Sequence, residues 1–399
     1  MDSDRARIQA DLAGQLSGSI RCDDNYLQMY ASDASIYEVQ PSGVVFPANT
    51  DDVVACVRYA EANDLSVIPR GGGSNVTGGC VGNGLVLDFS YSMRRVKAVE
   101  RDSVTVEPGI VLGELNRQLQ THDRFYSPDP ATRNVTTIGG TLSMNNSGSH
   151  WVVDGTPRDT VLKLKVVIGG GEVVEFLSGG EIASSNGYPC LRSQLLASRI
   201  KGIINRHERP RLKHQPHTKV NQAGYNVFDL QQGDQTDLTR LLVGAEGTLG
   251  VITEATLTTK PISKHRGVAL LFFDRLETAG HAALEIGKMG VAACDLLDRR
   301  LLSLARETKA EFHRLLPGDA EAMLLVEFQD VDDRAVKKKF DHLKDRIVSR
   351  KKWNCDIRLT TQLDKRDLYW KIVRRIVPSL YRLKGNRSCL LYTSPSPRD

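Results

Sequence analysis

The sequence has 399 residues, of which 40% are hydrophobic and 25% charged, and this is typical of a soluble globular protein with two or three domains. Its formal net charge of +5 suits an anionic cofactor or substrate but does not indicate a nucleic-acid-binding protein. Seven scattered cysteines without a CxxC pair argue against a disulfide framework, a zinc ribbon or an iron–sulfur site within this chain. We find no apolar run long enough for a membrane span and no secretory pattern at the start. We therefore expect a cytoplasmic protein, with peripheral association with the inner membrane as the alternative.

Hydrophobic periodicity predicts alternating helices and strands up to Lys260, after an N-terminal helical segment at 1–40. Thr50, followed by two aspartates, is predicted to cap a helix. The basic stretch 206–213 is interrupted by Glu208 and Pro210, and we expect a solvated loop there. The other predicted elements are strands at 66–68, 85–87 and 103–106, a helix at 112–119, and a hairpin of 161–168 with 173–176.

The composition changes near Lys260, where a second α+β region is predicted to begin. Its strand–helix–strand alternation predicts a sheet covered by helices on one face. The last residues, 389–399, have no periodicity and end in alternating Ser and Pro, so we expect a disordered tail or a non-native ending. The predicted elements are strands at 268–273, 323–328 and 355–360 and helices at 276–289 and 333–344.

A glycine-rich segment at 69–79 follows the strand at 66–68 and reads Pro-Arg-Gly-Gly-Gly-Ser-Asn-Val-Thr-Gly-Gly. Consecutive glycines leave backbone N–H groups free to converge on a diphosphate. The segment is not a Rossmann fingerprint, because Val76 stands where that motif requires a glycine, and it has no Walker lysine. By itself it is equally compatible with a tight loop.

Two later segments favour a ligand site over a plain turn. The polar stretch from Tyr126 to Gly148 is punctuated by glycines, and we expect a long irregular loop there, which is usually functional in a compact domain. The segment Val243–Ile252 contains Gly-Ala-Glu-Gly-Thr-Leu-Gly and lets the backbone approach a flat ligand.

These segments resemble, in order, the p-cresol methylhydroxylase (PCMH) and vanillyl-alcohol oxidase superfamily of FAD-linked oxidases and dehydrogenases. The resemblance is to the branch that contains glycolate oxidase, D-lactate dehydrogenase and D-2-hydroxyglutarate dehydrogenase, and it runs from about Tyr26 to about Arg387. The motifs that carry it are P-x-x-V-V-x-P at 41–47, Asp52-Val53, the R-G-G-G loop, V-x-P-G at 106–109, and the P-D-P, T-I-G-G and G-x-E-G-T-L-G segments.

The resemblance implies an α+β fold in two parts. A two-lobed PCMH-type FAD-binding domain is expected at 41–260, followed at 261–388 by a truncated FAD-linked oxidase cap domain for the substrate, α+β and ferredoxin-like. The first loop has no histidine for covalent attachment, so we expect non-covalent FAD. The segment Ser147-Gly148-Ser149-His150 differs from the family's usual asparagine-alanine-glycine run. We expect His150 to be a polar loop histidine, with a place near the flavin as the alternative.

The resemblance also implies which residues hold FAD, with the diphosphate at the backbone amides of 71–75 and the other segments around the ribityl chain and the isoalloxazine. The expected cofactor-binding residues are Arg70, Gly71, Gly72, Gly73, Ser74, Asn75 and Gly78 in the first segment, Pro128, Asp129, Thr137, Gly139, Gly140, Asn145 and Ser147 in the second, and Glu246, Gly247, Gly250 and Val251 in the third.

Near the end of the chain, Trp370–Pro378 resembles the family's tryptophan–arginine segment, in which an arginine faces the substrate carboxylate. The usual position is occupied by Val373, so Arg374 and Arg375 are the candidates, with a solvated helix face as the alternative. His214 and His217 are expected to be loop residues, and no metal site is predicted. The chain ends before the family's histidine-rich metal and base region, so we expect an amino-terminal fragment, with a [4Fe-4S] module in the missing part.

The resulting hypothesis is an FAD-dependent oxidoreductase that oxidises a small D-2-hydroxy acid such as D-lactate, glycolate or D-2-hydroxyglutarate by hydride transfer to the flavin. Its electrons would pass to an iron–sulfur module, a quinone or another carrier. Two alternatives remain: a sugar or alcohol oxidase of the same superfamily, and a flavin-binding subunit or fragment that is inactive alone.

Overall fold

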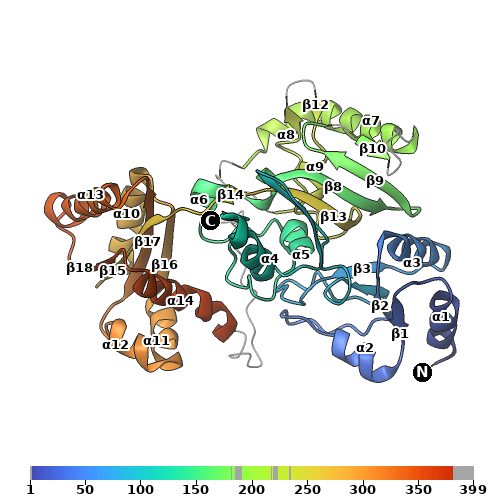
Figure 1. The fold of residues 1–399 in the computed structure, drawn as a ribbon, viewed down its shortest axis with the longest axis horizontal. Coiled ribbons are helices and arrows are strands. Elements are labelled where there is room, and N and C mark those ends of the chain that lie inside the picture. The colour runs from blue at the N-terminus through green and yellow to red at the C-terminus, as the bar shows by residue number, and fades with distance from the viewer. Residues whose placement is uncertain are drawn as a thin grey trace.

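The computed structural model describes residues 2–180, 182–184, 191–216, 218, 223–232 and 235–380. Its strands form a four-stranded and a six-stranded sheet in the N-terminal part of the chain and another four-stranded sheet in the C-terminal part. In Figure 1 the two N-terminal sheets lie side by side, and the C-terminal sheet stands apart with its own helices.

The first sheet has the strand order β1–β2–β4–β3, in which β2, β4 and β3 are parallel and β1 is antiparallel. Helix α3 (Thr50–Ala62) covers it by packing Val53 and Cys56 into its core. The predicted cap at Thr50 is wrong by one residue, because the extended Asn49 accepts the N–H of Asp52 and Thr50 is already helical. The other elements are α1 (Ser3–Ala13), β1 (Ser19–Arg21), α2 (Asp24–Tyr30), β2 (Gly43–Phe46), β3 (Val67–Arg70) and β4 (Leu85–Asp88).

The second sheet is antiparallel, with the order β10–β9–β8–β13–β6–β5. The predicted hairpin is confirmed, because β8 and β9 pair from Lys163–Leu177 to Ile168–Glu172 across the glycine turn. Val167 and Val251 pack with helix α3, so the two N-terminal sheets share a core. The strands are β5 (Val96–Val99), β6 (Ser103–Val106), β8 (Val161–Ile168), β9 (Glu172–Leu177), β10 (Ile182–Ser184) and β13 (Val251–Thr258), and nearby helices are α4 (Leu112–Leu119), α5 (Ile138–Met144), α6 (Trp151–Asp154), α7 (Leu191–Arg206) and α9 (Thr239–Leu242).

Two stretches predicted to be loops contain helices. The polar region 126–148 includes α5, which begins after Thr137 because the Thr137 hydroxyl accepts the N–H of Gly140. The basic stretch 206–213 includes α8 (Glu208–Lys213). Pro210 lies in the first turn of α8, where a missing backbone N–H breaks no intrahelical hydrogen bond.

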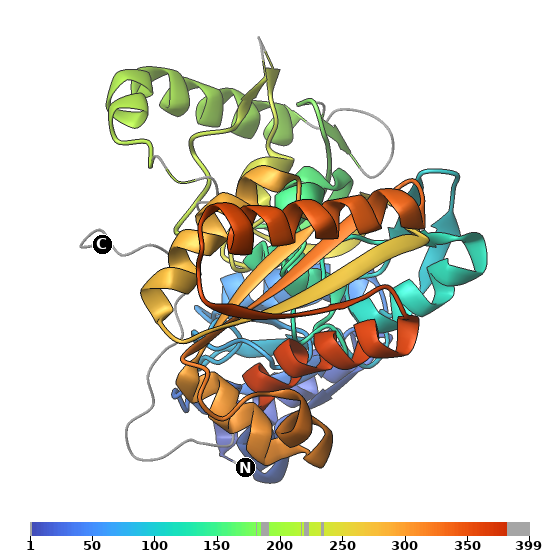
Figure 2. The same ribbon diagram turned by 90° about the vertical axis from the view of Figure 1, so that its left-hand side faces the viewer.

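The C-terminal sheet is antiparallel, with the order β16–β17–β15–β18, which confirms the predicted ferredoxin-like arrangement. The prediction that one face is covered is wrong, because alternate residues of β15 enter two separate cores. Such strands read as continuous apolar runs, since both of their faces are buried. Figure 2 shows the strands between α10 and α13 on one side and α11, α12 and α14 on the other. The elements are β15 (His265–Phe273), α10 (Leu276–Ile286), β16 (Ala293–Asp298), α11 (Arg299–Thr308), α12 (Ala310–Leu315), β17 (Ala322–Asp330), α13 (Asp333–Lys344), β18 (Cys355–Thr360) and α14 (Leu363–Leu380).

Candidate active site

The first glycine-rich loop lies against the residues that lead into α5. A Cβ atom at Gly71 would overlap the hydroxyl oxygen of Thr137, and one at Gly72 would overlap the carbonyl oxygen of Val135. Glycine is required here because any side chain would separate the two segments. The first two predicted segments are therefore in direct contact.

The third glycine-bearing segment approaches α5 as well. Glu246 donates its backbone N–H to the carbonyl of Ser143 (2.9 Å), and a Cβ at Gly247 would lie 3.3 Å from the ring of Pro69. Both Glu246 (φ 55°) and Gly247 (φ 77°) adopt left-handed backbone conformations that form a sharp turn. The structure thus brings all three segments together around one short helix.

The open amides of the first loop suit a diphosphate. Within the described part of the chain, the backbone N–H groups of residues 71–74 and 76 have no hydrogen-bond acceptor, whereas the N–H of Asn75 is directed at the thiol of Cys80. The Asn75 side-chain oxygen instead accepts the N–H groups of Thr77 (2.6 Å) and Gly79 (3.2 Å) and so shapes the loop. Successive unpaired amides form an anion-binding concavity, and FAD carries its negative charge on the diphosphate.

Arg70 closes the base of this loop. Its guanidinium donates to the carbonyl oxygens of Tyr30 (3.2 Å), Ser32 (2.8 Å) and Cys80 (3.2 Å). These contacts hold both ends of the loop against the N-terminal segment, so a direct contact of Arg70 with the cofactor remains a prediction.

The other predicted cofactor residues are placed as follows. Asn145 ends α5 in a left-handed conformation, and its side-chain oxygen accepts the N–H of Arg158 (3.0 Å). Val251 is buried in the core shared by the two N-terminal sheets. The remaining positions all lie in the three converging segments. Two of them form hydrogen bonds: the Ser74 hydroxyl with that of Thr136, and the Ser147 carbonyl, which accepts the N–H of Asp129. The others are buried or closely approached by a neighbour: Pro128 is buried, Gly140 follows the cap of α5, and Gly78, Gly139 and Gly250 face Tyr37, Pro108 and Val166, respectively.

A buried charged cluster joins the second segment to the C-terminal sheet. His150, which is 6% exposed, places Nδ1 2.7 Å from Oδ2 of Asp129 and Nε2 3.2 Å from Oε1 of Glu327 on β17. His150 lies in a turn, as expected of a loop histidine, but its imidazole is buried between two carboxylates from different parts of the chain, and its place relative to the flavin stays a prediction.

Glu327 is the centre of this cluster and is fully buried. Arg266 on β15 binds both of its oxygens (2.8 Å each), and Gln329 donates to Oε1 (2.8 Å). Trp370 on α14 donates its indole N–H to Oε2 (2.7 Å). A buried carboxylate is tolerated when it is paired and hydrogen-bonded in this way.

The charges in the cluster stabilise one another. Burial by itself lowers the pKa of His150, but hydrogen bonds to Asp129 and Glu327, together with the negative charges of both carboxylates, raise it to about 10. Burial raises the pKa of Glu327, yet the hydrogen bond from His150 and the charge of Arg266 hold it well below its usual range. His150 and Glu327 are therefore both charged at neutral pH.

A second contact between the two parts joins Ser149 and Asp295. The hydroxyl of Ser149 donates to Oδ2 of Asp295 on β16 (2.6 Å). Burial raises the pKa of Asp295, and the nearby negative charge of Asp129 adds to this effect. Asp295 is thus a carboxylate with raised proton affinity at the edge of the cluster.

The two predicted substrate arginines on α14 differ in position. Arg374 lies against the ring of Trp370, with Cζ 5.3 Å from its centroid, and has no ion-pair partner among the described residues. Burial lowers the pKa of Arg374 to about 10, and the charge of nearby Arg133 contributes. Arg375 is exposed, and Val373 packs against the core of the C-terminal sheet.

Glu327, Arg266 and Asp295 were not predicted as site residues. Glu327 had a detectable signal, because it is a carboxylate within the otherwise apolar run Met323–Phe328. A buried strand rarely carries a charge without a partner. Nothing in the sequence identified that partner, since His150 precedes Glu327 by 177 residues.

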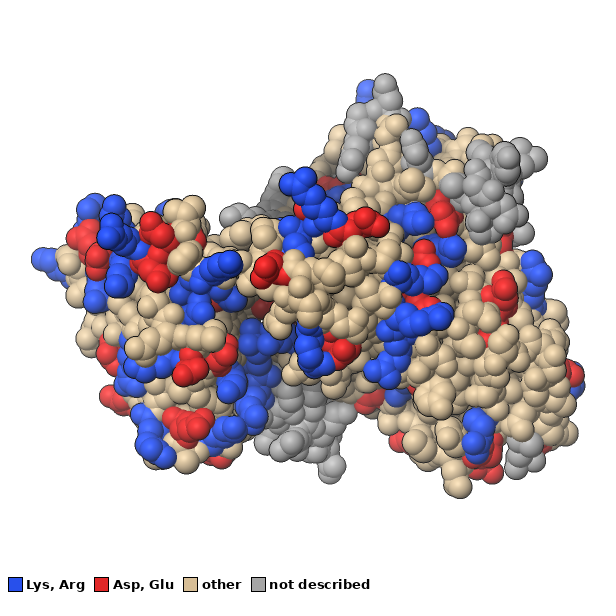
Figure 3. Space-filling model, viewed as in Figure 1, with Lys and Arg blue, Asp and Glu red and all other residues tan. Residues whose placement is uncertain are grey.

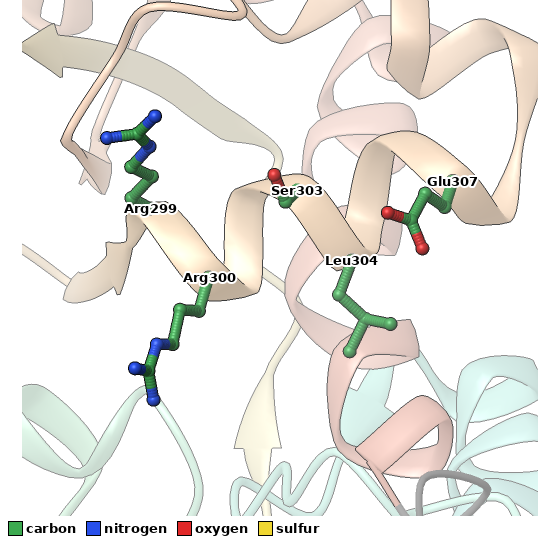
Figure 4. A pocket seen from close by; sticks show the side chains of 5 residues that line it. All are labelled: Arg299, Arg300, Ser303, Leu304 and Glu307. Carbon is green, nitrogen blue, oxygen red and sulfur yellow. The ribbon is translucent and has the colours of Figure 1, made fainter.

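Other surface features lie outside this cluster. Figure 4 shows a hollow along α11 lined by Arg299, Arg300, Ser303, Leu304 and Glu307, none of which takes part in the contacts described above. Figure 3 shows Lys and Arg side chains gathered where α14 faces the N-terminal part of the molecule.

Among the residues that the structure describes, no set of three His, Cys, Asp or Glu side chains could hold a metal ion. His214 is exposed, and His217 lies outside the described residues. No helix within the described ranges is both long and apolar enough to cross a membrane.

Comparison with known proteins agrees with this geometry. Residues 41–177 match the FAD binding domain family, and residues 262–394 match the C-terminal domain of FAD linked oxidases. The chain is 34% identical to a D-2-hydroxyglutarate dehydrogenase of Pantoea ananatis over 69% of its own length, and 29% identical to the glycolate oxidase subunit GlcD of Bacillus subtilis over 78%. These matches span 28% and 57% of the two relatives' lengths.

A solved structure of an alkyldihydroxyacetonephosphate synthase has the same fold. It aligns with a TM-score of 0.65 at 16% identity, over 95% of this chain and 65% of the synthase. The fold and site therefore define a two-part flavoprotein of the oxidoreductase class, with FAD as its cofactor. The chain belongs to the FAD-linked oxidases of the vanillyl-alcohol oxidase and p-cresol methylhydroxylase superfamily.

Proposed function

We propose that the chain is the flavin-holding part of a dehydrogenase that oxidises a small D-2-hydroxy acid. The observation that supports this best is Arg374, a partly buried guanidinium without an ion-pair partner in the described residues, beside the charged cluster that joins the two domains. The names of the relatives, which include a D-lactate dehydrogenase of Arabidopsis thaliana at 33% identity over 65% of the chain, point to the same substrate class.

In this proposal Arg374 binds the substrate carboxylate, because a guanidinium offers paired N–H donors that match the two oxygens of a carboxylate. Its place on the ring of Trp370 holds the guanidinium at the junction of the domains. Arg375 is exposed and is the less suitable of the two predicted arginines.

Asp295 is the carboxylate that we assign to the hydroxyl proton of the substrate. Glu327 and Asp129 are both engaged by His150, whereas the hydrogen-bond donor to Asp295 is the neutral hydroxyl of Ser149. Its raised pKa makes it a better proton acceptor than an ordinary carboxylate. When bound, FAD supplies the acceptor for the hydride from C2 of the substrate.

The amides of residues 71–76 and the turn at Glu246–Gly247 would hold the cofactor without a covalent bond. Electrons would leave through an iron–sulfur module, a quinone or another carrier. A sugar or alcohol oxidase is the less favoured alternative, since an uncharged substrate would leave the Arg374 guanidinium without a partner.

The test is turnover of D-lactate, glycolate and D-2-hydroxyglutarate by the purified flavoprotein with an artificial electron acceptor. Oxidation of at least one of them, with a strong preference for the D enantiomer where one exists, supports the proposal. Bound FAD without oxidation of any hydroxy acid would favour a flavin-binding subunit that is inactive alone. Oxidation of sugars or simple alcohols in preference to hydroxy acids would favour a sugar or alcohol oxidase of the same superfamily.

A further inference from the structure

We propose that His150 is a positioning residue that couples the two domains and, through Glu327 and Trp370, sets the place of the Arg374 guanidinium. The inference rests on the proposed function in one respect, because it takes Arg374 as the ligand of the substrate carboxylate. The coupling itself is visible in the structure without substrate.

The chain of contacts begins in the FAD-binding domain. The carboxylate of Asp129 accepts hydrogen bonds from the ring Nδ1 (2.7 Å) and from the backbone N–H (3.2 Å) of His150. Asp129 in turn is tied to the backbone of Ser147 by its own N–H (2.9 Å). The imidazole is therefore fixed in orientation by the domain that carries the flavin segments.

The next contacts lie in the C-terminal domain. The other ring nitrogen of His150 faces Glu327, and the second oxygen of Glu327 accepts the indole N–H of Trp370. The rings of His150 and Trp370 also lie 5.0 Å apart at an angle of 35°. Trp370 packs in the core of the C-terminal sheet, and His150 contacts it in two ways, through the carboxylate of Glu327 and directly with the imidazole.

Arg374 comes one helical turn after Trp370 on α14, and its guanidinium rests on the indole. The guanidinium forms no ion pair with a described residue, and its contact with the indole is a cation–π contact with Cζ 5.3 Å from the ring centroid. A rotation of Trp370 would therefore move Arg374. This makes Arg374 dependent on a residue of the other domain.

The protonation state of His150 suits this role. The pKa of about 10 keeps both ring nitrogens protonated at neutral pH, so that the imidazole donates to Asp129 and Glu327 at once. The other charged groups nearby are Arg266, which binds Glu327, and Asp295 and Arg374 at the edge of the cluster.

Two variants separate the two contacts of the ring. In His150→Gln the side-chain amide reaches the position of Nε2 and can still donate to Glu327. In His150→Asn it reaches only the position of Nδ1, toward Asp129. The exposed His313 on α12 provides the matched control His313→Gln.

For substrate oxidation, we expect His150→Asn to raise KM for the hydroxy acid by about tenfold or more with a smaller change in kcat, because a displaced arginine binds the carboxylate less well. His150→Gln should restore much of the wild-type KM, while FAD content stays unchanged in both. In an Arg374→Lys background, His150→Asn should add little further loss. Full additivity with Arg374→Lys, or an unchanged KM in His150→Asn, would overturn the proposal.

A substrate-free measurement keeps the coupling testable if no hydroxy acid is oxidised. The chain has three tryptophans, and the variant Trp370→Phe identifies the emission of Trp370. His150→Asn should change that component, whereas His313→Gln should not. If His150→Asn does not fold, His150→Gln is compared with Asp129→Asn by the same readout. An unchanged Trp370 emission in variants that fold refutes the coupling, while failure of turnover alone refutes only the proposed function.

Discussion

The Nε2 atom of His150 lies 3.2 Å from Oε1 of Glu327, and this contact joins the FAD-binding domain to the buried centre of the C-terminal domain. Both side chains are almost completely buried and charged at neutral pH. The domains therefore meet through an ion pair as well as through the contact between the rings of His150 and Trp370. Its position beside Trp370 and Arg374 makes it relevant to stability and, under the proposed function, to substrate binding.

Replacing Glu327 by Gln should destabilise the protein by about 3 kcal/mol or more, because the substitution leaves the partly buried Arg266 without its counter-charge and removes one of the two counter-charges of the buried His150. Urea unfolding followed by circular dichroism measures this difference. The control is Glu277→Gln on α10, where the side chain is 71% exposed and should change stability by less than about 0.5 kcal/mol. Equal effects of the two variants would mean that the cluster contributes no more than a surface charge.

The contribution of His150 to stability should depend on pH. Its folded-state pKa of about 10 lies above the ordinary value of 6.5, so its contribution is fully present below about pH 6.5 and is lost as the pH rises toward 10. The difference in unfolding free energy between the wild type and His150→Gln should therefore shrink across that interval. A difference that is constant from pH 6.5 to pH 10 would show that the imidazolium is not stabilised by Asp129 and Glu327.

Gly72→Ala should weaken FAD binding by about tenfold or more, or about 1.4 kcal/mol, because the new Cβ would displace the loop from Val135. Flavin fluorescence during titration of the apoprotein gives the affinity. Gly169→Ala is the control, since a Cβ at Gly169 meets no atom within 4 Å. An unchanged affinity in Gly72→Ala would argue that residues 71–76 do not bind the diphosphate.

Arg374→Gln should raise KM for the hydroxy acid by about a hundredfold, because one charge-assisted carboxylate contact contributes about 1.5–3 kcal/mol. Arg375→Gln, on the exposed side of the same helix, should change KM by less than about twofold. Steady-state kinetics on both variants decides between the two arginines. The reverse order of effects would assign the substrate carboxylate to Arg375.

Much of the fold follows from local sequence patterns. The 161–168 hairpin, the helix at 112–119 and the strand at 355–360 appear in the structure where periodicity predicts them. Burial on both faces of β15 was missed, because a short apolar run does not show how many faces it covers. The helix α5 was missed because its glycines and threonines have low helix propensity, while the Thr137 cap and tertiary contacts stabilise it.

The site was predictable only in part. The glycine segments have a local signature, and the structure brings them together around α5. The charged cluster has none, because His150, Glu327 and Trp370 come from distant parts of the chain and meet only when the domains pack. The position of Arg374 beside Trp370 follows from helical spacing, but its approach to the other domain does not.

The proposed function is tested most directly by anaerobic mixing of the FAD-loaded protein with D-lactate, glycolate or D-2-hydroxyglutarate while the visible flavin absorbance is followed. The proposed function predicts that at least one of these acids bleaches the flavin band, and that Arg374→Gln requires a much higher concentration of that acid for the same rate. A flavin that is bound at full occupancy but is reduced by none of the three acids would contradict it.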